Sequence, residues 1–386
     1  MNMIDSPSDS ASNSVPRQCV VALPERIKGG RLSELLERVP YLSEQVLQVA
    51  YDQARHEVRF THADTDDARL SQAVHELVDV LLTARILAQK EERSNLEQQP
   101  TPSLDHSFSA DVFSGRVGLA AMDALDRAIC EIAERNGAGL RRYPSVYQAK
   151  TMQCCGYHKN FPQNVFGVTR IPHDYSVIRQ IRDSDSIDID PSLFVSDGAY
   201  LQPCICYHCY EEWRGAKIEN ALLSSAGRCF RHEIRWKLDD FRRNEFTMRE
   251  IAFVGDAEWV ELRRLGIMQE VWDLFCDLGL GGRIVTARDP FFHYDDMMTK
   301  GAVQLMADAK YELEFVTTDQ RASSIASFNN CQDSLTAKFD ITGPDGDKDR
   351  HSGCVAFGLD RWCTSLFTRH GTDHNAWPKT LRRFLS

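Results

Sequence analysis

The order of strand and helix patterns in the second half of the chain constrains the fold more than any other feature. After Tyr143–Val146, short strand-like segments alternate with polar loops, and a long helical stripe returns at Trp259–Leu278. Few strand–helix–strand units are present, so the chain has few of the long crossover connections that join parallel strands. We therefore predict an α+β fold in which an antiparallel sheet is flanked by helices.

The composition is that of a globular enzyme. The chain has 386 residues, 42% of them hydrophobic and 26% charged, and this length favours two domains. The formal net charge of -11 argues against a broad basic surface for nucleic acid. Twelve cysteines without a signal-peptide pattern fit a reducing compartment, and no apolar run has the length of a membrane span. We therefore expect a cytoplasmic protein.

Local patterns divide the chain into four parts. Residues 1–17 are polar and Ser-rich and are expected to form a disordered tail. Residues 18–90 follow a β-α-β-β-α order, which predicts a small α+β accessory domain with docking or dimerisation as its default role. Residues 91–107 are charged and then Pro/Ser-rich, as in a linker, and residues 108–386 form the main domain.

The spacing of apolar residues places individual elements within these domains. In the accessory domain we expect strands at Cys19–Leu23, Val46–Tyr51 and Glu57–Thr61, and helices at Arg31–Arg38 and Arg69–Gln89. In the main domain we expect a helix at Val112–Asn136 and strands at Ala309–Thr317 and Ala337–Thr342.

Cysteine is concentrated in Leu201–Tyr210, where Cys204, Cys206, His208 and Cys209 lie within six positions. Thiolates and an imidazole so close together suggest a soft-metal site, with zinc as the first choice. An alternating strand that buries these residues as small apolar side chains explains the same pattern. The local sequence leaves both interpretations open.

A second stretch has residue types suited to a nucleotide. Arg228–Glu233 and Arg242–Glu250 are expected to be two strands joined by a long charged loop, with Arg231 and Glu233 on one face. Phe246 follows Arg242 at a spacing of four and would lie on the same side. An Arg can bind phosphate through two hydrogen bonds, and an aromatic ring can stack on a purine. A solvated charged hairpin is the alternative.

A third stretch, Gly353–Trp362, is apolar except near Gly358-Leu-Asp-Arg361. An Arg in such a run either reaches solvent or holds an anion, because burial without a partner is costly. A bound phosphate is therefore one of two interpretations for Arg361.

Together these stretches resemble the catalytic domain of class II aminoacyl-tRNA synthetases. Arg231-His-Glu233 and the return strand to Glu250 look like the second motif of that class, and Gly358–Arg361 like the third. Pro144 is similar to the proline of the first motif. Within the class, Leu201–Cys206 resembles the Leu-x-Pro-Thr-x-Glu loop of seryl-tRNA synthetases, and Asn330–Asp333 their Asn-Cys-Thr-Asp segment.

The set Cys206, Glu250 and Cys354 narrows the resemblance further. It is similar to the zinc site of atypical methanogen seryl-tRNA synthetases and of their truncated bacterial relatives, the amino acid:[carrier protein] ligases. Gly156–Pro162 and Ser327–Asn329 look more like the ligases, and the resemblance covers roughly residues 108–386. Residues 19–90 do not have the pattern of the coiled coil that binds tRNA in ordinary seryl enzymes.

The resemblance implies ATP-dependent activation of a small amino acid, glycine or alanine, to an aminoacyl-adenylate. The amino acid would then pass to the phosphopantetheine thiol of a carrier protein. One zinc ion per chain, Mg²⁺ with ATP and a homodimer are also implied. The implied site residues are Arg231 and Arg361 for catalysis; Arg231, Glu233, Arg242, Phe246 and Arg361 for ATP; Cys204, Ser327 and Asn329 for substrate; and Cys206, Glu250 and Cys354 for zinc.

Two other classes of function stay open. One is tRNA aminoacylation, which needs a basic tRNA surface, and the other is a non-catalytic synthetase paralogue. The second is favoured by a departure from the family pattern, since Ser324 stands near the place of an acidic residue that helps to hold the ATP metal. The Mg²⁺ ligands are therefore open, with Glu312 and Glu314 as candidates. Apart from Cys204 and the two cysteines of the zinc set, we expect the cysteines to be packing residues.

Overall fold

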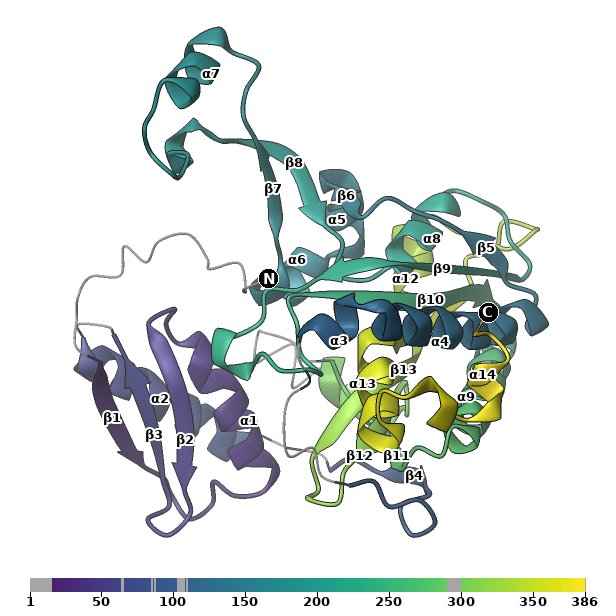
Figure 1. The fold of residues 1–386 in the computed structure, drawn as a ribbon, viewed down its shortest axis with the longest axis horizontal. Coiled ribbons are helices and arrows are strands. Elements are labelled where there is room, and N and C mark those ends of the chain that lie inside the picture. The colour runs from purple at the N-terminus through teal and green to yellow at the C-terminus, as the bar shows by residue number, and fades with distance from the viewer. Residues whose placement is uncertain are drawn as a thin grey trace. The chain divides into compact units, whose positions relative to one another are not determined.

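The computed structural model describes residues 16–63, 66–84, 86, 88–102, 108, 110–289 and 300–385 (Figure 1). The chain divides into two compact units, of which the first comprises Met1–Ala88, Ile171–Phe194 and Ile234–Trp236 and the second the remaining residues. Most of the expected disordered tail, residues 1–15, lies outside the described residues. Within the described parts of the chain, no helix combines the length and the apolar character needed to cross a membrane.

The first unit contains a three-stranded antiparallel sheet in the order β1–β3–β2. Its strands are β1 (Arg17–Ala22), β2 (Val46–Asp52) and β3 (Glu57–His62), and its helices include α1 (Gly30–Arg38) and α2 (Asp67–Thr83). Leu35, Leu70 and Val74 bury one helical face against the sheet residues Val58 and Phe60. The expected element order is confirmed. Helix α2 ends before the predicted Gln89 because Ala84 adopts extended backbone angles.

The second unit is built on an eight-stranded sheet in the order β4–β11–β12–β13–β14–β10–β9–β5. All neighbouring strands are antiparallel except β5 and β9, which are parallel. The strands are β4 (Glu91–Ser94), β5 (Gly139–Arg141), β9 (Ala221–Phe230), β10 (Glu245–Gly255), β11 (Gly282–Thr286), β12 (Lys310–Val316), β13 (Ala322–Gln332) and β14 (His351–Gly358). The predicted α+β class with an antiparallel sheet is confirmed.

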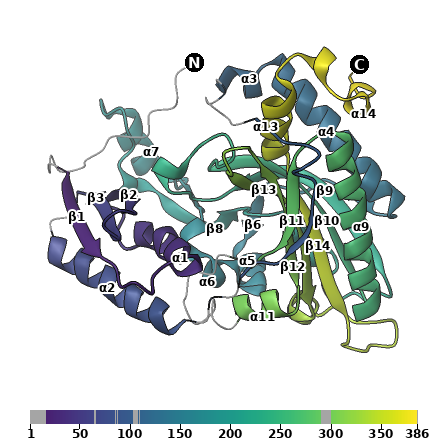
Figure 2. The ribbon, with the colours of Figure 1, turned by 90° about the horizontal axis from the view of Figure 1, so that it is seen from below.

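The pleat of this sheet separates two different environments. Successive side chains on a strand point to opposite faces, so Ile251 and Phe253 of β10 belong to one buried cluster and Ala252 and Val254 to the other. The first cluster packs against α4 (Arg116–Arg135), α9 (Ala257–Asp277) and α13 (Leu359–His370). Figure 2 shows α4 and α9 along one side of the sheet.

The opposite face carries the cysteine-rich cluster. It is covered by α5 (Ala149–Cys155), α8 (Cys206–Glu212), α12 (Ser334–Lys338) and a small sheet of β6 (Val146–Gln148), β8 (Val195–Leu201) and β7 (Gly167–Arg170). The second unit also contains the short helices α3 (Ala110–Ser114), α6 (Tyr157–Asn160), α11 (Ala302–Met306) and α14 (Lys379–Arg382), whereas α7 (Tyr175–Arg182) belongs to the first unit.

Two expectations for the main domain differ from the structure. The strand predicted at Ala337–Thr342 is wrong: the residues close helix α12, and Thr342 forms only an isolated bridge with Lys217. The segment expected to be a linker contains β4, which pairs with β11 at the edge of the large sheet. Its charged sequence, Glu91-Glu-Arg-Ser94, suits an edge strand because solvent and charge protect an exposed edge from pairing with other chains.

A buried ion pair joins the sheet to helix α4. The Arg249 guanidinium of β10 donates to both carboxylate oxygens of Asp126 at 2.6 and 2.8 Å, and to Ser224 Oγ at 3.1 Å. The Arg249 side chain is 8% exposed and that of Asp126 is 29% exposed. A two-pronged pair in this setting fixes the helix across the sheet.

We predict that Asp126→Ala lowers the free energy of unfolding by roughly 2–4 kcal/mol, because it leaves the Arg249 charge buried without its partner. Urea denaturation measures the effect. Asp123→Ala, at an exposed position of the same helix, is the control and should change stability by less than about 0.5 kcal/mol. Equal effects of the two substitutions would contradict the proposed importance of the pair.

Candidate active site

Arg231 and Phe246 are brought together at the loop end of the β9–β10 hairpin. The guanidinium carbon of Arg231 lies 5.3 Å from the Phe246 ring centroid, and Arg231 Nε donates to the Pro203 carbonyl at 3.1 Å. Phe246 is on β10, opposite Cys229 of β9. Arg231 was expected on the strand but lies just beyond its end at Phe230, where the chain starts to turn. A cation and an aromatic face are thus presented together.

Arg242 and Glu233 form an ion pair in the loop of the same hairpin, with 3.1 Å between Arg242 NH1 and Glu233 Oε2. The Glu233 backbone N–H donates to Asn244 Oδ1 at 2.9 Å. Both residues were expected on strands, but β9 ends before Glu233 and β10 begins after Arg242. Strand periodicity therefore does not determine where the Glu233 and Arg242 side chains point, and the contacts within the loop hold them in place.

Arg361 lies in the first turn of α13, directly after β14. Its Nε donates to the Phe241 carbonyl and its NH1 to the Ser324 carbonyl, each at 2.6 Å. In the described part of the chain, no carboxylate forms an ion pair with Arg361 or Arg231. Burial and the neighbouring charges of Arg231 and Arg242 lower the pKa of Arg361. Arg361 therefore lies close enough to Arg231 and Arg242 for their charges to act on it, and three guanidinium groups so placed form a site for a polyanion.

The three expected metal ligands come from α8, β10 and β14. Cys206 is the first residue of α8, and its backbone N–H donates to Glu250 Oε2 at 2.6 Å. On the neighbouring strands Glu250 is opposite Ala356, and Ala252 is opposite Cys354. Since opposed residues share a face, Glu250 and Cys354 both point to the cysteine-rich side of the sheet.

Cys204 was expected to line the substrate pocket, but it lies beside two of the expected metal ligands, Cys206 and Glu250. The sulfur atoms of Cys204 and Cys206 are 3.9 Å apart, and the donor atoms of Cys204, Cys206 and Glu250 all lie within 4.8 Å of one another. All three residues are buried. Cys331, expected to be a packing residue, faces Cys354: hydrogen bonds from the thiols of Cys206 and Cys331 hold the pKa of Cys354 well below its usual range.

The electrostatics of the cluster fit a divalent cation. Burial, and then the neighbouring Cys354, raise the pKa of Glu250 to about 7. A carboxyl group and several thiols buried together must stay protonated or share a cation, because isolated buried charges are expensive. Sulfur and carboxylate donors are those that zinc prefers among the common protein metals. The residues present therefore fit zinc.

Ser327 and Asn329, expected to contact substrate, lie on β13 opposite Ala356 and Cys354. Asn329 Nδ2 lies 3.2 Å from the Cys354 carbonyl, 3.5 Å from Cys354 Sγ and 3.1 Å from Ser327 Oγ. In this structure Asn329 therefore holds the Cys354 side chain in place. Both residues border the candidate metal ligands.

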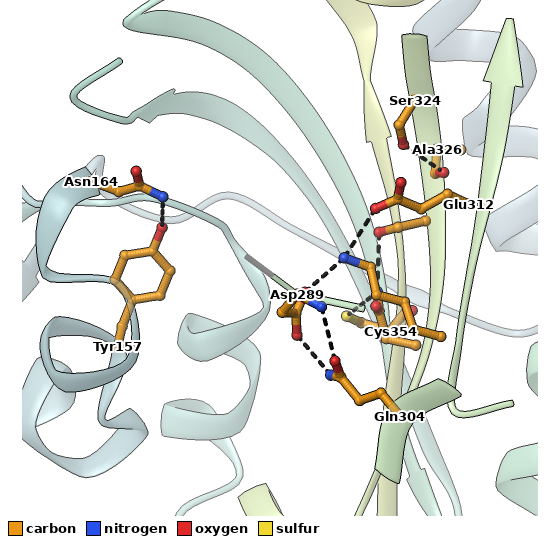
Figure 3. Close-up of polar contacts among 11 residues, drawn as sticks. Tyr157, Asn164, Asp289, Gln304, Glu312, Ser324, Ala326 and Cys354 are labelled. Carbon is orange, nitrogen blue, oxygen red and sulfur yellow. Dashed lines mark hydrogen bonds and ion pairs between the residues drawn. The ribbon is translucent and has the colours of Figure 1, made fainter. Parts of the chain in front are cut away.

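Next to these residues lies a charged group of which the sequence pointed to Glu312 but to neither Lys310 nor Asp289. Lys310 Nζ lies 2.6 Å from Asp289 Oδ1 and 3.0 Å from Glu312 Oε1, and Gln304 donates to the second Asp289 oxygen at 2.8 Å. Figure 3 shows Asp289, Gln304 and Glu312 on the same side as Cys354. The alternation of Lys310, Glu312 and Glu314 with Tyr311, Leu313 and Phe315 was a sequence signal that could have found this polar face.

The two candidate Mg²⁺ ligands are in different situations. Glu312 lies opposite Ser327 and next to Lys310, within the site. Both carboxylates have a basic partner: Glu312 pairs with Lys310 of the site at 3.0 Å, and Glu314 pairs with Arg283 of the next strand, β11, at 2.8 Å. Ser324, at the departure from the family pattern, offers its carbonyl to Arg361. Glu312 is therefore the better placed of the two acids.

The remaining members of the local cysteine–histidine pattern are packing residues. His208 stacks on Tyr143 with 5.1 Å between ring centroids and lies 4.4 Å from the Tyr147 ring centroid. Burial lowers the pKa of His208 to about 4, which keeps the imidazole neutral near pH 7. Cys209 is fully buried, and burial raises the pKa of its thiol.

Solved structures identify the class of this fold. M. kandleri SerRS, in its crystal structure with A. aeolicus tRNASec, superposes with a TM-score of 0.60 at 18% identity, covering 96% of this chain and 77% of that chain. Seryl-tRNA synthetase from Pyrococcus horikoshii, complexed with ATP, gives a TM-score of 0.56 at 15% identity, covering 83% and 79%. The catalytic fold is that of the class II aminoacyl-tRNA synthetases.

Sequence comparison narrows the class to a family. No family model matches the sequence. Amino acid–[acyl-carrier-protein] ligase 1 of Bradyrhizobium diazoefficiens is 31% identical over 293 residues, which are 73% of this chain and 87% of that protein. The chain therefore belongs to the family of amino acid–[acyl-carrier-protein] ligases, and the resemblance inferred from its motifs is confirmed.

Because His208 stays neutral in the folded protein near pH 7, the free energy of unfolding should depend on pH. Between its folded-state pKa of about 4 and the ordinary value of about 6.5, the unfolded chain binds a proton that the folded chain does not. The free energy of unfolding should therefore fall as the pH drops through this window. His208→Phe should remove roughly 1–2 kcal/mol of that fall, after allowance for partial exposure.

Urea denaturation of both proteins at pH 7 and at pH 4.5 measures this difference. His75→Phe, at an exposed position on α2, is the control and should keep the pH dependence of the unsubstituted protein. An unchanged pH dependence in His208→Phe would contradict the account of a neutral packing histidine.

Proposed function

We propose that the protein activates a small amino acid with ATP and transfers it to the phosphopantetheine thiol of a carrier protein. The observation that carries this proposal is the placement of two groups on one sheet face. The cationic group of Arg231, Arg242 and Arg361 and the metal-binding set of Cys206, Glu250 and Cys354 flank the same strands, since Phe246 and Glu250 share a face of β10. One site suits phosphates, and the other suits an amine.

In the proposed reaction the arginines act on ATP. Arg231 would hold the α-phosphate and Arg361 the γ-phosphate, where their fixed charges stabilise the charge that develops during transfer. Phe246 would stack on adenine, and the Arg242–Glu233 pair would line the nucleotide site. Magnesium would accompany ATP, with Glu312 as the nearest candidate ligand. Positioning and electrostatics suffice for this class of reaction, so we assign no general base.

Cys206, Glu250 and Cys354 would hold one zinc ion, which binds the neutral α-amine of the amino acid when present. Asn329 would keep Cys354 in place, and Ser327 would lie along the substrate. Holding the amine fixes the carboxylate near Arg231. Glycine and alanine remain the expected substrates because the resemblance to the ligases implies small amino acids.

The choice of acceptor rests on family membership and charge. The Bradyrhizobium relative is named as a ligase for acyl carrier protein, whereas the superposed solved structures are seryl-tRNA synthetases. A net charge of -11 is unfavourable for a tRNA surface. By the same resemblance we propose a cytoplasmic homodimer, with residues 18–90 as an accessory domain.

A transfer assay with radiolabelled glycine or alanine, ATP, holo-carrier protein and bulk tRNA tests the function directly. We expect label on the carrier and not on tRNA. Label on tRNA would support the synthetase alternative. Absence of ATP–pyrophosphate exchange with every amino acid would support the non-catalytic paralogue.

Arginine variants test the phosphate site. Arg231→Ala and Arg361→Ala should each lower amino-acid-dependent ATP–pyrophosphate exchange by at least about 100-fold, as expected for loss of a charge aimed at the transition state. Arg228→Ala is a matched control on the same hairpin, because this exposed arginine pairs only loosely with Glu245 at 3.7 Å. Its exchange rate should stay within about 2-fold. Full activity of Arg361→Ala would exclude the assigned role.

Metal content tests the zinc ligands. The purified protein should carry one zinc ion per chain, and Cys206→Ala or Cys354→Ala should lose it, as measured by mass spectrometry of the metal. Cys363→Ala is the control, because Cys363 is buried in the core cluster on the opposite face of the sheet. Retention of zinc by both ligand variants would contradict the assignment.

A further inference from the structure

We infer that Cys204 is a fourth protein ligand of the metal site, which closes the coordination sphere in the absence of substrate. The inference deepens the proposed function and rests on its metal site. It concerns a residue that the family resemblance assigned to the substrate pocket.

The distance between Cys204 Sγ and Cys206 Sγ matches shared coordination. A zinc–sulfur bond is about 2.3 Å long, so two thiolates on one tetrahedral zinc are separated by about 3.8 Å. The observed separation is 3.9 Å. It is far longer than a disulfide bond, and the donor atoms of Cys204, Cys206 and Glu250 all lie within 4.8 Å of one another. Cys204 is thus at the distance of a co-ligand.

The backbone on both sides of Cys204 is held in place. The Gln202 side chain donates to the Arg228 carbonyl at 2.6 Å, and the Pro203 carbonyl accepts from Arg231 Nε at 3.1 Å. The Tyr147 hydroxyl donates to the Cys204 carbonyl and lies 4.0 Å from Cys204 Sγ. Tyr147 itself is 1% exposed. Because these contacts fix the loop, the Cys204 thiol is directed at the cluster before any metal binds.

Because the three donor residues are buried, water has little access to the Cys204 thiol. Cys204 is 8% exposed, Cys206 is 6% exposed and Glu250 is 2% exposed. Cys354 lies outside this group of three but is hydrogen-bonded through its thiol to Cys206, and with it the site would offer three sulfur atoms and one carboxylate, the number of donors in a tetrahedral zinc site. A substrate amine would then reach the metal only after Cys204 leaves or the coordination number rises to five. The substrate-free site is therefore closed by the protein itself.

The test compares metal binding by the full chain in four variants, with the metal alone as the probe. In the cobalt-substituted protein the sulfur-to-metal charge-transfer absorption scales with the number of bound thiolates. Cys204→Ala should lose about a third of this absorption, because two thiolates remain of three, and should bind zinc at least about 10-fold more weakly in chelator competition. Cys204→Ser keeps the size of the side chain and should show the same loss of absorption.

Cys209→Ala is the matched control, because Cys209 is a buried cysteine on the adjoining helix, outside the three-residue donor group. It should match the unsubstituted protein in both measurements. If Cys206→Ala loses the metal while Cys204→Ala and Cys204→Ser keep the full absorption and affinity, the inference about Cys204 is overturned and the proposed function stands. If the unsubstituted protein binds neither cobalt nor zinc, the metal part of both proposals is overturned.

Discussion

The hydrogen bond from the Cys206 backbone N–H to the Glu250 carboxylate joins helix α8 to the central strand β10 at the candidate metal site. Glu250 lies in the middle of a central strand with Ile251 beside it, and the pleat sends these two side chains to opposite faces. One face can therefore be filled by Ile251, Phe253 and the helices, while the other receives the N-terminus of α8. A carboxylate buried in this position needs donors and a cation, and the surrounding residues provide the donors.

The same sheet face separates two kinds of charge. At the loop end of the β9–β10 hairpin, burial and the neighbouring charges of Arg231 and Arg242 lower the pKa of Arg361. Towards the middle of the strands lie buried thiols and a carboxyl group, donors that suit a cation. In the proposed reaction the amine of an amino acid would bind at these donors and the phosphates of ATP at the arginines. The proposed chemistry thus follows from the distribution of charge along two adjacent strands.

The sequence predicted the class of fold better than the local backbone. Spacing along a strand placed Phe246 and Glu250 on one face, because both lie inside the regular strand β10, whereas Cys354 was proposed only through the family resemblance. Arg242 and Glu233 lie in a loop, where strand periodicity has no meaning. Strand β13 was missed because its polar residues, such as Ser327 and Asn329, face the site. The proximity of Cys204 to Cys206 depends on a turn held by distant residues, including Tyr147.

The most direct measurement is a crystal structure of the complex with a non-hydrolysable aminoacyl-adenylate analogue, recorded at the zinc absorption edge. We expect an anomalous peak for zinc between Cys206, Glu250 and Cys354, with the amine of the analogue bound to this metal. We also expect the phosphate mimic against Arg231 and the adenine ring on Phe246. A metal located elsewhere, or an analogue whose amine lies away from the metal, would contradict the account.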